Sequence, residues 1–424
     1  MKKILFRFFF IFLLLNISPW YLLYDIPGIS YLLDILYERE VWIVGVFNED
    51  LLNVKNTLNE NGGGSGDTSY AWAQFYTYLI LSFLGCTIWT LVDRKRQNNY
   101  NTLDFWLRSI IRYYLALVSF SYGIVKLFAL QMPFPSLSQL ATPLGDYLPM
   151  RLSWMFIGYS TQYQIFSGVM ETIVGILLLN RKTVTLGALL GVGVFANVVM
   201  INLSYDVPVK LYSMQLLIYS IFLIANDWKR LLNFFCLNQD ASPTILYNID
   251  LKKKWQRITR IIFKVGFIVL FVVIPFNESW TRYNAEFNKG ELKPIRIGVY
   301  DIKIFIKNND TTTISNTDEI IWKDFIFDKD GMGSVNTLDT LFRQRYRRGY
   351  FTYQPDSVTQ TIVFKKYATD SINLFEMKYR IVDETTLELW GKLRTDSLRF
   401  KLERSNRHFQ LSERQFHWIS ESNR

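Results

Sequence analysis

The chain has 424 residues, of which 50% are hydrophobic and 17% aromatic, and its mean hydropathy is +0.10. The formal net charge is +10, but the basic residues gather at the ends of apolar runs, which argues against nucleic-acid binding and favours a multi-span membrane protein. With two histidines, two cysteines and no CxxC, HExxH, Walker or GxGxxG motif, the sequence predicts no metal site and no His-based catalysis.

Apolar runs predict an all-α membrane bundle of about seven spanning helices in the first two thirds of the chain. The runs cover residues 4–24, 72–92, 105–130, 159–179, 184–203, 211–226 and 258–275. The first follows Lys2 and Lys3 and has no small-residue cleavage site, so we expect a retained anchor. Residues 29–48 are apolar but carry four charges, and we expect them to lie at the membrane interface.

Lysine and arginine clusters predict the orientation of this bundle. They fall at residues 2–3, 94–96, 181–182 and 229–254, which lie on one side of the membrane in a seven-span count. Because positive loops stay in the cytoplasm, we expect a cytoplasmic N-terminus in the bacterial inner membrane. An odd number of spans then places residues 276–424 in the periplasm.

This C-terminal part has the period of β-strands rather than helices. Short alternating segments occur within residues 295–306, 361–367, 375–381, 387–393 and 398–402, with tight turns between the later ones. Short strands joined by short turns predict an up-and-down antiparallel barrel, similar to that of the lipocalins. The expected domains are a two-span extension with an external loop (1–104), a four-helix membrane bundle (105–230), a cytoplasmic linker with the last span (231–275) and the extracytoplasmic β domain (276–424).

Two ionisable residues lie inside predicted spans, where polar groups are costly and often functional. Lys126 ends the third span, and a desolvated lysine can act as a base; the alternative is a lysine that reaches the interface or pairs with a carboxylate. Glu171 lies in the fourth span on one face with Gln164, Gly168 and Gly175. Lys126 and Glu171 are the candidate catalytic residues, and an ion pair between them is the other interpretation.

Two external proline-containing segments, residues 131–158 and 204–210, are expected to cover a pocket at the outer mouth of the bundle. The alternative is a pair of rigid structural loops. For the two asparagines in the fifth span, the alternative is hydrogen bonding between helices. The candidate ligand-binding residues are Tyr122, Gln131, Asp146, Trp154, Tyr159, Tyr163, Gln164, Asn197, Asn202, Asp206 and Lys210.

Residues 105–230 resemble the DoxX-like family of four-helix membrane proteins. The resemblance is carried by Tyr122-Gly123-Ile124-Val125-Lys126-Leu127, the external loop through Gly145-Asp146, Glu171-Thr172-Ile173-Val174-Gly175-Ile176-Leu177-Leu178-Leu179, Thr185-Leu186-Gly187-Ala188 and Asp206-Val207-Pro208-Val209-Lys210. DoxX-type chains are linked to membrane thiosulfate:quinone oxidoreductase, so the resemblance implies a quinone ligand and partner subunits. Neither cysteine of this chain, Cys86 or Cys236, occupies a position suited to sulfur chemistry, which argues against that particular reaction.

The Gly-x-x-Lys-Leu element is also similar to one in the HTTM and vitamin K-dependent carboxylase families. In those families the lysine is associated with quinol-dependent base chemistry, and a β-rich domain also lies on the non-cytoplasmic side. That similarity implies Lys126 as the base.

Two functions follow. In the first, the bundle binds a quinone or an isoprenoid-like lipid as a subunit of a membrane oxidoreductase, with Lys126, Glu171 and Asp206 lining the pocket. In the second, the helices anchor a non-enzymatic scaffold in the lipid bilayer, and the external β domain binds an envelope protein or an apolar ligand.

Overall fold

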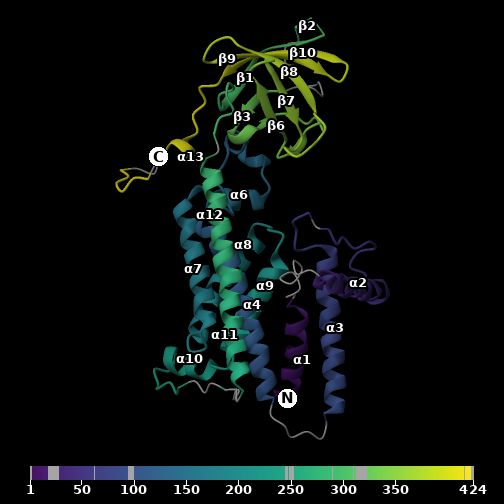
Figure 1. Ribbon diagram of the computed structural model, residues 1–424, viewed down its shortest axis with the longest axis vertical. Helices are drawn as coiled ribbons and strands as arrows, with labels where there is room; N and C mark the ends of the chain where they lie inside the picture. The colour runs from purple at the N-terminus through teal and green to yellow at the C-terminus, as the bar shows by residue number, and fades with distance from the viewer. Residues whose placement is uncertain are drawn as a thin grey trace. The chain divides into compact units, whose positions relative to one another are not determined.

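The structure is a computed structural model, and Figure 1 shows its helices and strands. It describes residues 2–17, 28–61, 63–93, 100–243, 247, 253–288, 290–308, 310–311, 322–414 and 416–421. The chain divides into two compact units. The helical unit comprises Met1–Met132 and Ser160–Thr281, and the barrel unit comprises Pro133–Tyr159 and Arg282–Arg424. The chain therefore leaves the helical unit once between two of its helices and again within its last helix.

Long apolar helices dominate the helical unit. Its helices are α1 (Lys2–Leu15), α2 (Ile29–Phe47), α3 (Ser69–Val92), α4 (Asn101–Leu127), α7 (Thr161–Leu179), α8 (Val184–Ser204), α9 (Lys210–Ile224), α10 (Trp228–Phe235) and α11 (Lys254–Ile268), which continues through a π-helical turn into α12 (Ile274–Phe287). Five are long and apolar enough to cross a membrane: Ser69–Val92, Asn101–Leu127, Thr161–Leu179, Val184–Ser204 and Lys254–Glu286. These match five of the seven predicted spans.

The other two predicted spans are shorter in the part of the chain that the structure describes. Helix α9 is apolar but has 15 residues, and α1 has 14. Most of the remainder of the predicted first span, residues 18–24, lies outside the described residues. The interfacial segment predicted at 29–48 forms α2, which is not among the five long apolar helices. The total of seven spans stays a prediction.

Helices α4, α7, α8 and α9 form the centre of the helical unit. They share a core that includes Leu115, Val174 and Phe195. The axes of α4 and α7 approach closely because each presents a glycine at the crossing: an added Cβ at Gly168 would lie 2.8 Å from the carbonyl oxygen of Gly123. Small residues at such crossings are typical of membrane helices, which pack through close backbone contact.

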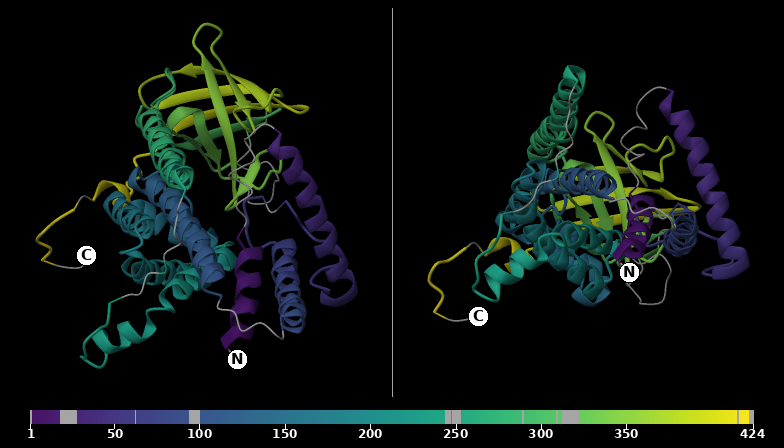
Figure 2. Two further views of the ribbon diagram at one scale, coloured as in Figure 1. Left: turned by 60° about the horizontal axis from the view of Figure 1, so that its bottom comes forward. Right: turned by 90° about the horizontal axis from the view of Figure 1, so that it is seen from below.

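The predicted barrel is confirmed. Eight strands pair antiparallel in chain order: β1 (Gly298–Lys307), β3 (Asp324–Phe327), β4 (Met332–Val335), β6 (Arg348–Asp356), β7 (Thr361–Lys365), β8 (Phe375–Ile381), β9 (Thr386–Leu393) and β10 (Asp396–Arg404). Two short strands lie outside this series: β2 (Asp310–Thr311) pairs with β1, and β5 (Arg343–Arg345) pairs with β6. Pairing of β10 with β1, from Tyr300 opposite Arg404 to Lys307 opposite Leu398, closes the ring of eight strands. Figure 2 shows the closed sheet from two further directions.

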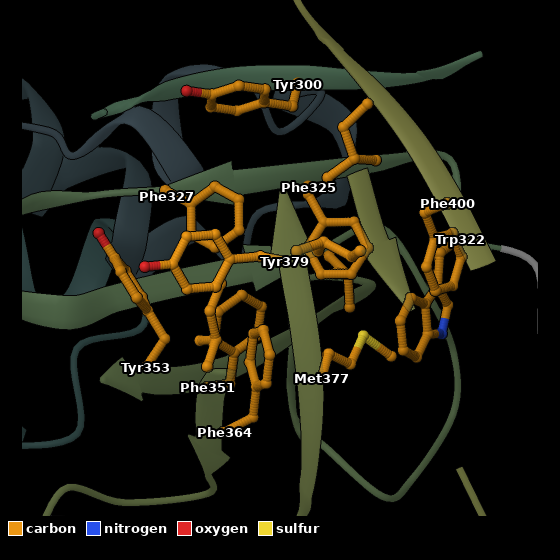
Figure 3. Packing of buried hydrophobic residues seen from close by; sticks show 14 of the residues in the cluster. Tyr300, Trp322, Phe325, Phe327, Phe351, Tyr353, Phe364, Met377, Tyr379 and Phe400 are labelled. Atoms are coloured by element: carbon orange, nitrogen blue, oxygen red, sulfur yellow. The ribbon is translucent and has the colours of Figure 1, made fainter. Parts of the chain in front are cut away.

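Aromatic side chains fill the inside of this barrel (Figure 3). Trp322 stacks on Phe400 with ring centroids 5.1 Å apart, and Phe364 stacks on Phe375 at 4.6 Å. Phe325 and Phe327 are fully buried between them. The closed antiparallel barrel is thus observed, while the likeness to lipocalins stays a prediction. Much of its interior is packed with aromatic side chains.

One segment of the barrel unit comes from the connection between α4 and α7. It contains α5 (Leu137–Leu140), a short 3-10 turn (Leu144–Asp146) and α6 (Pro149–Tyr159). Ala141 packs on Val299 and Ile326, which point outward from β1 and β3. The Ser334 hydroxyl donates a 2.8 Å hydrogen bond to the Ser138 hydroxyl and accepts one of 3.0 Å from Arg348 Nε. The α5–α6 segment thus packs on the outer face of the barrel.

Candidate functional site

The two candidate catalytic residues form an ion pair. Lys126 lies in the last turn of α4 and Glu171 in the middle of α7, and both are buried. Lys126 Nζ donates to Glu171 Oε1 at 2.6 Å and to Oε2 at 2.7 Å. The ring of Tyr122 lies 5.5 Å from the same nitrogen. Lys126 and Glu171 are therefore paired, as one of the two interpretations expected, and the catalytic role stays a prediction.

Gln164, which lies two helical turns before Glu171 on α7, forms hydrogen bonds with the segment that follows α4. Gln164 is buried and donates from Nε2 to the carbonyl oxygen of Met132 at 2.7 Å, and it accepts from the Met132 amide at 3.0 Å. Both halves of its amide group are thereby used. Gln131 next to it has a buried Oε1 with no hydrogen-bond partner among the residues that the structure describes. Tyr163 precedes Gln164 and is exposed.

The remaining candidates of the helical unit lie around the α8–α9 connection. Lys210 Nζ donates to Asp206 at 2.7 Å and lies 3.6 Å from Asp67. Asp67 also accepts from the amides of Lys210 and Leu211 at 2.9 and 3.0 Å, so it caps the start of α9. Asn202 is buried and Nδ2 donates to the Val209 carbonyl at 3.4 Å, whereas Asn197 is exposed on α8. This is a structural turn.

Three further candidates, Asp146, Trp154 and Tyr159, belong to the barrel unit. Asp146 lies 3.3 Å from the Arg347 guanidinium, and Tyr159 packs near Phe134 with ring centroids 5.9 Å apart. The predicted set is therefore split. Tyr122, Lys126 and Glu171 are brought together, while Asp206 and Lys210 form a separate group. Gln164 and Asn202 bond to backbone groups, and Tyr163 and Asn197 are exposed.

A cavity that the sequence analysis missed lies at the other end of α4. Its volume is about 690 Å³, and it is lined by the first half of α4, the α7–α8 turn and the end of α9. Among the residues that the structure describes, five cationic side chains line it against two carboxylates, which is an excess of three cations. The cations are Arg108, Arg112, Arg181, Lys182 and Arg230, and the carboxylates are Asp104 and Asp227.

The signal for this cavity is present in the sequence. Residues 101, 104, 105, 108, 109 and 112 all line it, and their spacing of three and one places them on one face of α4. Two arginines on that face interrupt an otherwise apolar helix. Charged residues inside a predicted membrane span indicate a functional site, and this applies to the two arginines as much as to Lys126. Within the described part of the chain, no group of three His, Cys, Asp or Glu side chains could hold a metal ion.

Comparison with known proteins gives one relative to report. The uncharacterized protein YwoB of Bacillus subtilis (strain 168) is 32% identical over 84 residues, which are 20% of this chain and 54% of YwoB. The match thus spans about half the length of that relative. No family model and no solved structure matches the chain.

Proposed function

We propose that this chain is an integral membrane protein that works as an envelope scaffold, in which the helical unit is the anchor and the barrel binds a protein partner on its outer surface. The observation that carries the proposal is the aromatic filling of the barrel. Trp322, Phe351 and Phe364 occupy the space where a ligand-carrying barrel holds its ligand. For this reason the proposal places the partner on the outer surface of the barrel.

The hydrogen bonding inside the helical unit supports an anchoring role. Lys126 is neutralised by Glu171, and Gln164 uses its whole amide group on Met132. These bonds stabilise the fold and occupy the polar groups of Lys126, Glu171 and Gln164. The Lys and Arg distribution supports an inner-membrane location with the N-terminus in the cytoplasm and the barrel in the periplasm.

Photo-crosslinking in living cells tests the scaffold. A photoreactive phenylalanine analogue is placed at Leu338, Val358 or Ile372, which are all exposed on the barrel unit. We expect a discrete adduct of one protein at one of these positions, identified by mass spectrometry. The matched control is the analogue at Ile261, an exposed position of α11, where that adduct should be missing. Equal adducts at all four positions, or none on the barrel, contradict the proposal.

The second candidate is a quinone-binding subunit of a membrane oxidoreductase. The buried Lys126–Glu171 pair favours it, because a titratable pair in a membrane helix bundle is often part of a ligand or proton site. The test is chromatographic and mass-spectrometric measurement of quinone in the purified full chain and in Lys126→Met/Glu171→Leu, which removes both charges together. This candidate predicts stoichiometric quinone in the wild type and its loss in the double variant; the scaffold predicts no stoichiometric quinone in either.

A further inference from the structure

The charge balance of the buried cations singles out one arginine. Four cationic residues are buried in the part of the chain that the structure describes: Arg7, Arg112, Lys126 and Arg348. Arg7 has Asp93 at 3.1 Å, Lys126 has Glu171 at 2.6 Å and Arg348 has Asp324 at 2.6 Å. Among the described residues, no carboxylate lies within 4 Å of Arg112.

The surroundings of Arg112 leave one of its hydrogen-bond donors, Nε, without a partner among the described residues. The residue is 9% exposed. Its guanidinium carbon lies 4.9 Å from the centre of the Tyr113 ring. A buried charge without a counter-charge is costly, and proteins usually compensate it with a partner or a ligand. Arg112 lines the 690 Å³ cavity, so a bound anion would be its partner there.

The other charges of the cavity are arranged to leave this space positive. Asp104 accepts from Arg108 Nε through both oxygens, at 3.0 and 2.9 Å, and is thereby neutralised. Asp227 accepts from Arg230 at 2.9 Å and from the Thr185 hydroxyl. Both carboxylates of the lining are thus already paired with arginines.

The cavity also has apolar walls, formed by Phe105, Val184 and Leu223. Its volume of about 690 Å³ lies within the range of roughly 300–1,000 Å³ that ligand sites occupy. Arg112 lies eleven residues into α4, about 16 Å along its axis at about 1.5 Å per residue. The cavity thus extends from the start of the long apolar helix α4 toward its middle. A basic pocket between apolar helices has the chemistry that recognises phosphate head groups of lipids. The fork of a guanidinium matches the oxygens of a phosphate.

We propose that this cavity binds the phosphate group of an anionic membrane lipid, with Arg112 as the central ligand. The phosphate supplies the missing counter-charge, and the first part of the acyl chains lies against the apolar walls. This site does not depend on the scaffold function proposed above. A soluble phosphate has the same head-group chemistry, and the experiment separates the two sources.

The test uses the full chain purified in a neutral detergent. Native mass spectrometry measures binding of phosphatidylglycerol and of dioleoylglycerol, which has no phosphate, and thermal unfolding is followed with sodium phosphate against sodium chloride at equal ionic strength. We expect phosphatidylglycerol to bind and dioleoylglycerol not to bind. Arg112→Gln should weaken phosphatidylglycerol binding about tenfold or more, as loss of a charge-assisted bond does.

Two further variants make the result specific. Arg260→Gln, an exposed arginine of α11, removes the same charge from the same unit and should leave the affinity unchanged. Arg112→Lys keeps the charge but not the fork, and should bind with intermediate affinity. If Arg112→Gln fails to fold, the proposal is tested by two other measurements. These are the binding of the two lipids by the wild type and the affinity of Arg112→Lys for phosphatidylglycerol.

Three results overturn the proposal. The first is equal retention of the two lipids by the wild type. The second is unchanged phosphatidylglycerol binding in both Arg112 variants when they are folded. The third is stabilisation by sodium phosphate alone, which would mean that the phosphate is a soluble one rather than a lipid head group.

Discussion

The two units solve the problem of filling an interior in different ways. In the helical unit, glycines bring backbones together, so that an added Cβ at Gly168 would lie 2.7 Å from the Leu127 amide nitrogen. In the barrel, large aromatic rings fill the space between opposite strands. The ring centroid of Phe351 lies 5.1 Å from that of Phe364 and 6.1 Å from that of Phe342. The proposed membrane location of the helical unit accounts for this difference through the surrounding solvent. Water drives aromatic burial, whereas lipid does not, so membrane helices depend on close fit and internal polar bonds.

The units agree in one respect, which is that each buries a paired charge. The helical unit has Lys126 on Glu171, and the barrel has Arg348 bonded to both oxygens of Asp324, at 3.1 and 2.6 Å. Arg112 departs from this rule, and that departure is the reason to assign it a ligand. The contrast in packing predicts which substitutions damage each unit.

The largest effect is expected from emptying the barrel. Phe351 is 1% exposed, and Phe351→Ala removes a ring from the centre of the aromatic cluster. Such substitutions cost about 3–5 kcal/mol, and we expect about 4 kcal/mol here because neighbouring rings cannot collapse into the space. Thermal unfolding followed by tryptophan fluorescence measures it. Phe416→Ala, at a position 76% exposed, is the control and should cost less than about 0.5 kcal/mol. Equal losses would mean that the rings are not a packed core.

The next effect concerns charge in the helical unit. Lys126→Met leaves Glu171 buried without its partner, and we expect a loss of about 3 kcal/mol. The second substitution, Glu171→Leu, should restore most of that loss. Unfolding by dodecyl sulfate in mixed micelles measures both. The control is Lys264→Met, at an exposed position of α11. A double variant as unstable as the single one would show that the pair is not the source of the loss.

Much of this architecture could be predicted from the sequence because its signals are local. Apolar runs mark the five long helices, and alternation marks β7 to β10, with β8 at the predicted residues 375–381. Strands β3, β4 and β6 were missed since they are short, contain glycine or contain Pro355. The predicted strands at 295–306 merge into β1, and Ile295 and Ile297 precede it.

The candidate site was harder to predict because its contacts connect distant residues. The pairing of Lys126 with Glu171 was foreseen as one of two interpretations, since both lie in spans and face the bundle. The place of residues 133–159 in the barrel unit depends on bonds such as Ser138 to Ser334, which are 196 positions apart and leave no pattern in either segment. The arginine cavity does have a local signal, which is the pair Arg108 and Arg112 on one face of the apolar helix α4.

A smaller effect separates close packing from simple helix formation. Gly168→Ala should cost about 2 kcal/mol, because the new methyl group meets backbone atoms of α4 that can move only if the helices part. Gly193→Ala on α8 is the matched control, since an added Cβ there has no heavy atom within 4 Å. Its higher helix propensity should make it neutral or up to about 1 kcal/mol more stable. Unfolding by dodecyl sulfate in mixed micelles measures the stability of both variants. Equal stabilities would mean that close backbone contact between α4 and α7 does not stabilise the helical unit.

The smallest effect depends on pH and lies in the barrel unit. Burial raises the pKa of Tyr147 to about 12, and its hydroxyl donates to the Gln139 carbonyl at 2.5 Å. The neutral phenol is therefore favoured in the folded state. Its stabilisation is complete below the unfolded pKa of about 10 and is lost as pH rises from about 10 through about 12. Since Tyr147 is partly exposed, we expect the whole effect to be about 1 kcal/mol.

Tyr147→Phe isolates this contribution because phenylalanine cannot ionise. At pH 8 the variant should be about 1 kcal/mol less stable than the wild type, since it lacks the bond to Gln139. Between about pH 10 and pH 12 that difference should shrink, as the wild type alone loses stability on ionisation of Tyr147. Denaturant unfolding at a series of pH values measures it, with Tyr367→Phe, an exposed tyrosine, as the control. A stability difference between wild type and variant that stays constant to pH 12 would mean that burial does not keep Tyr147 neutral. The α5–α6 segment would then pack more loosely than the aromatic core of the barrel.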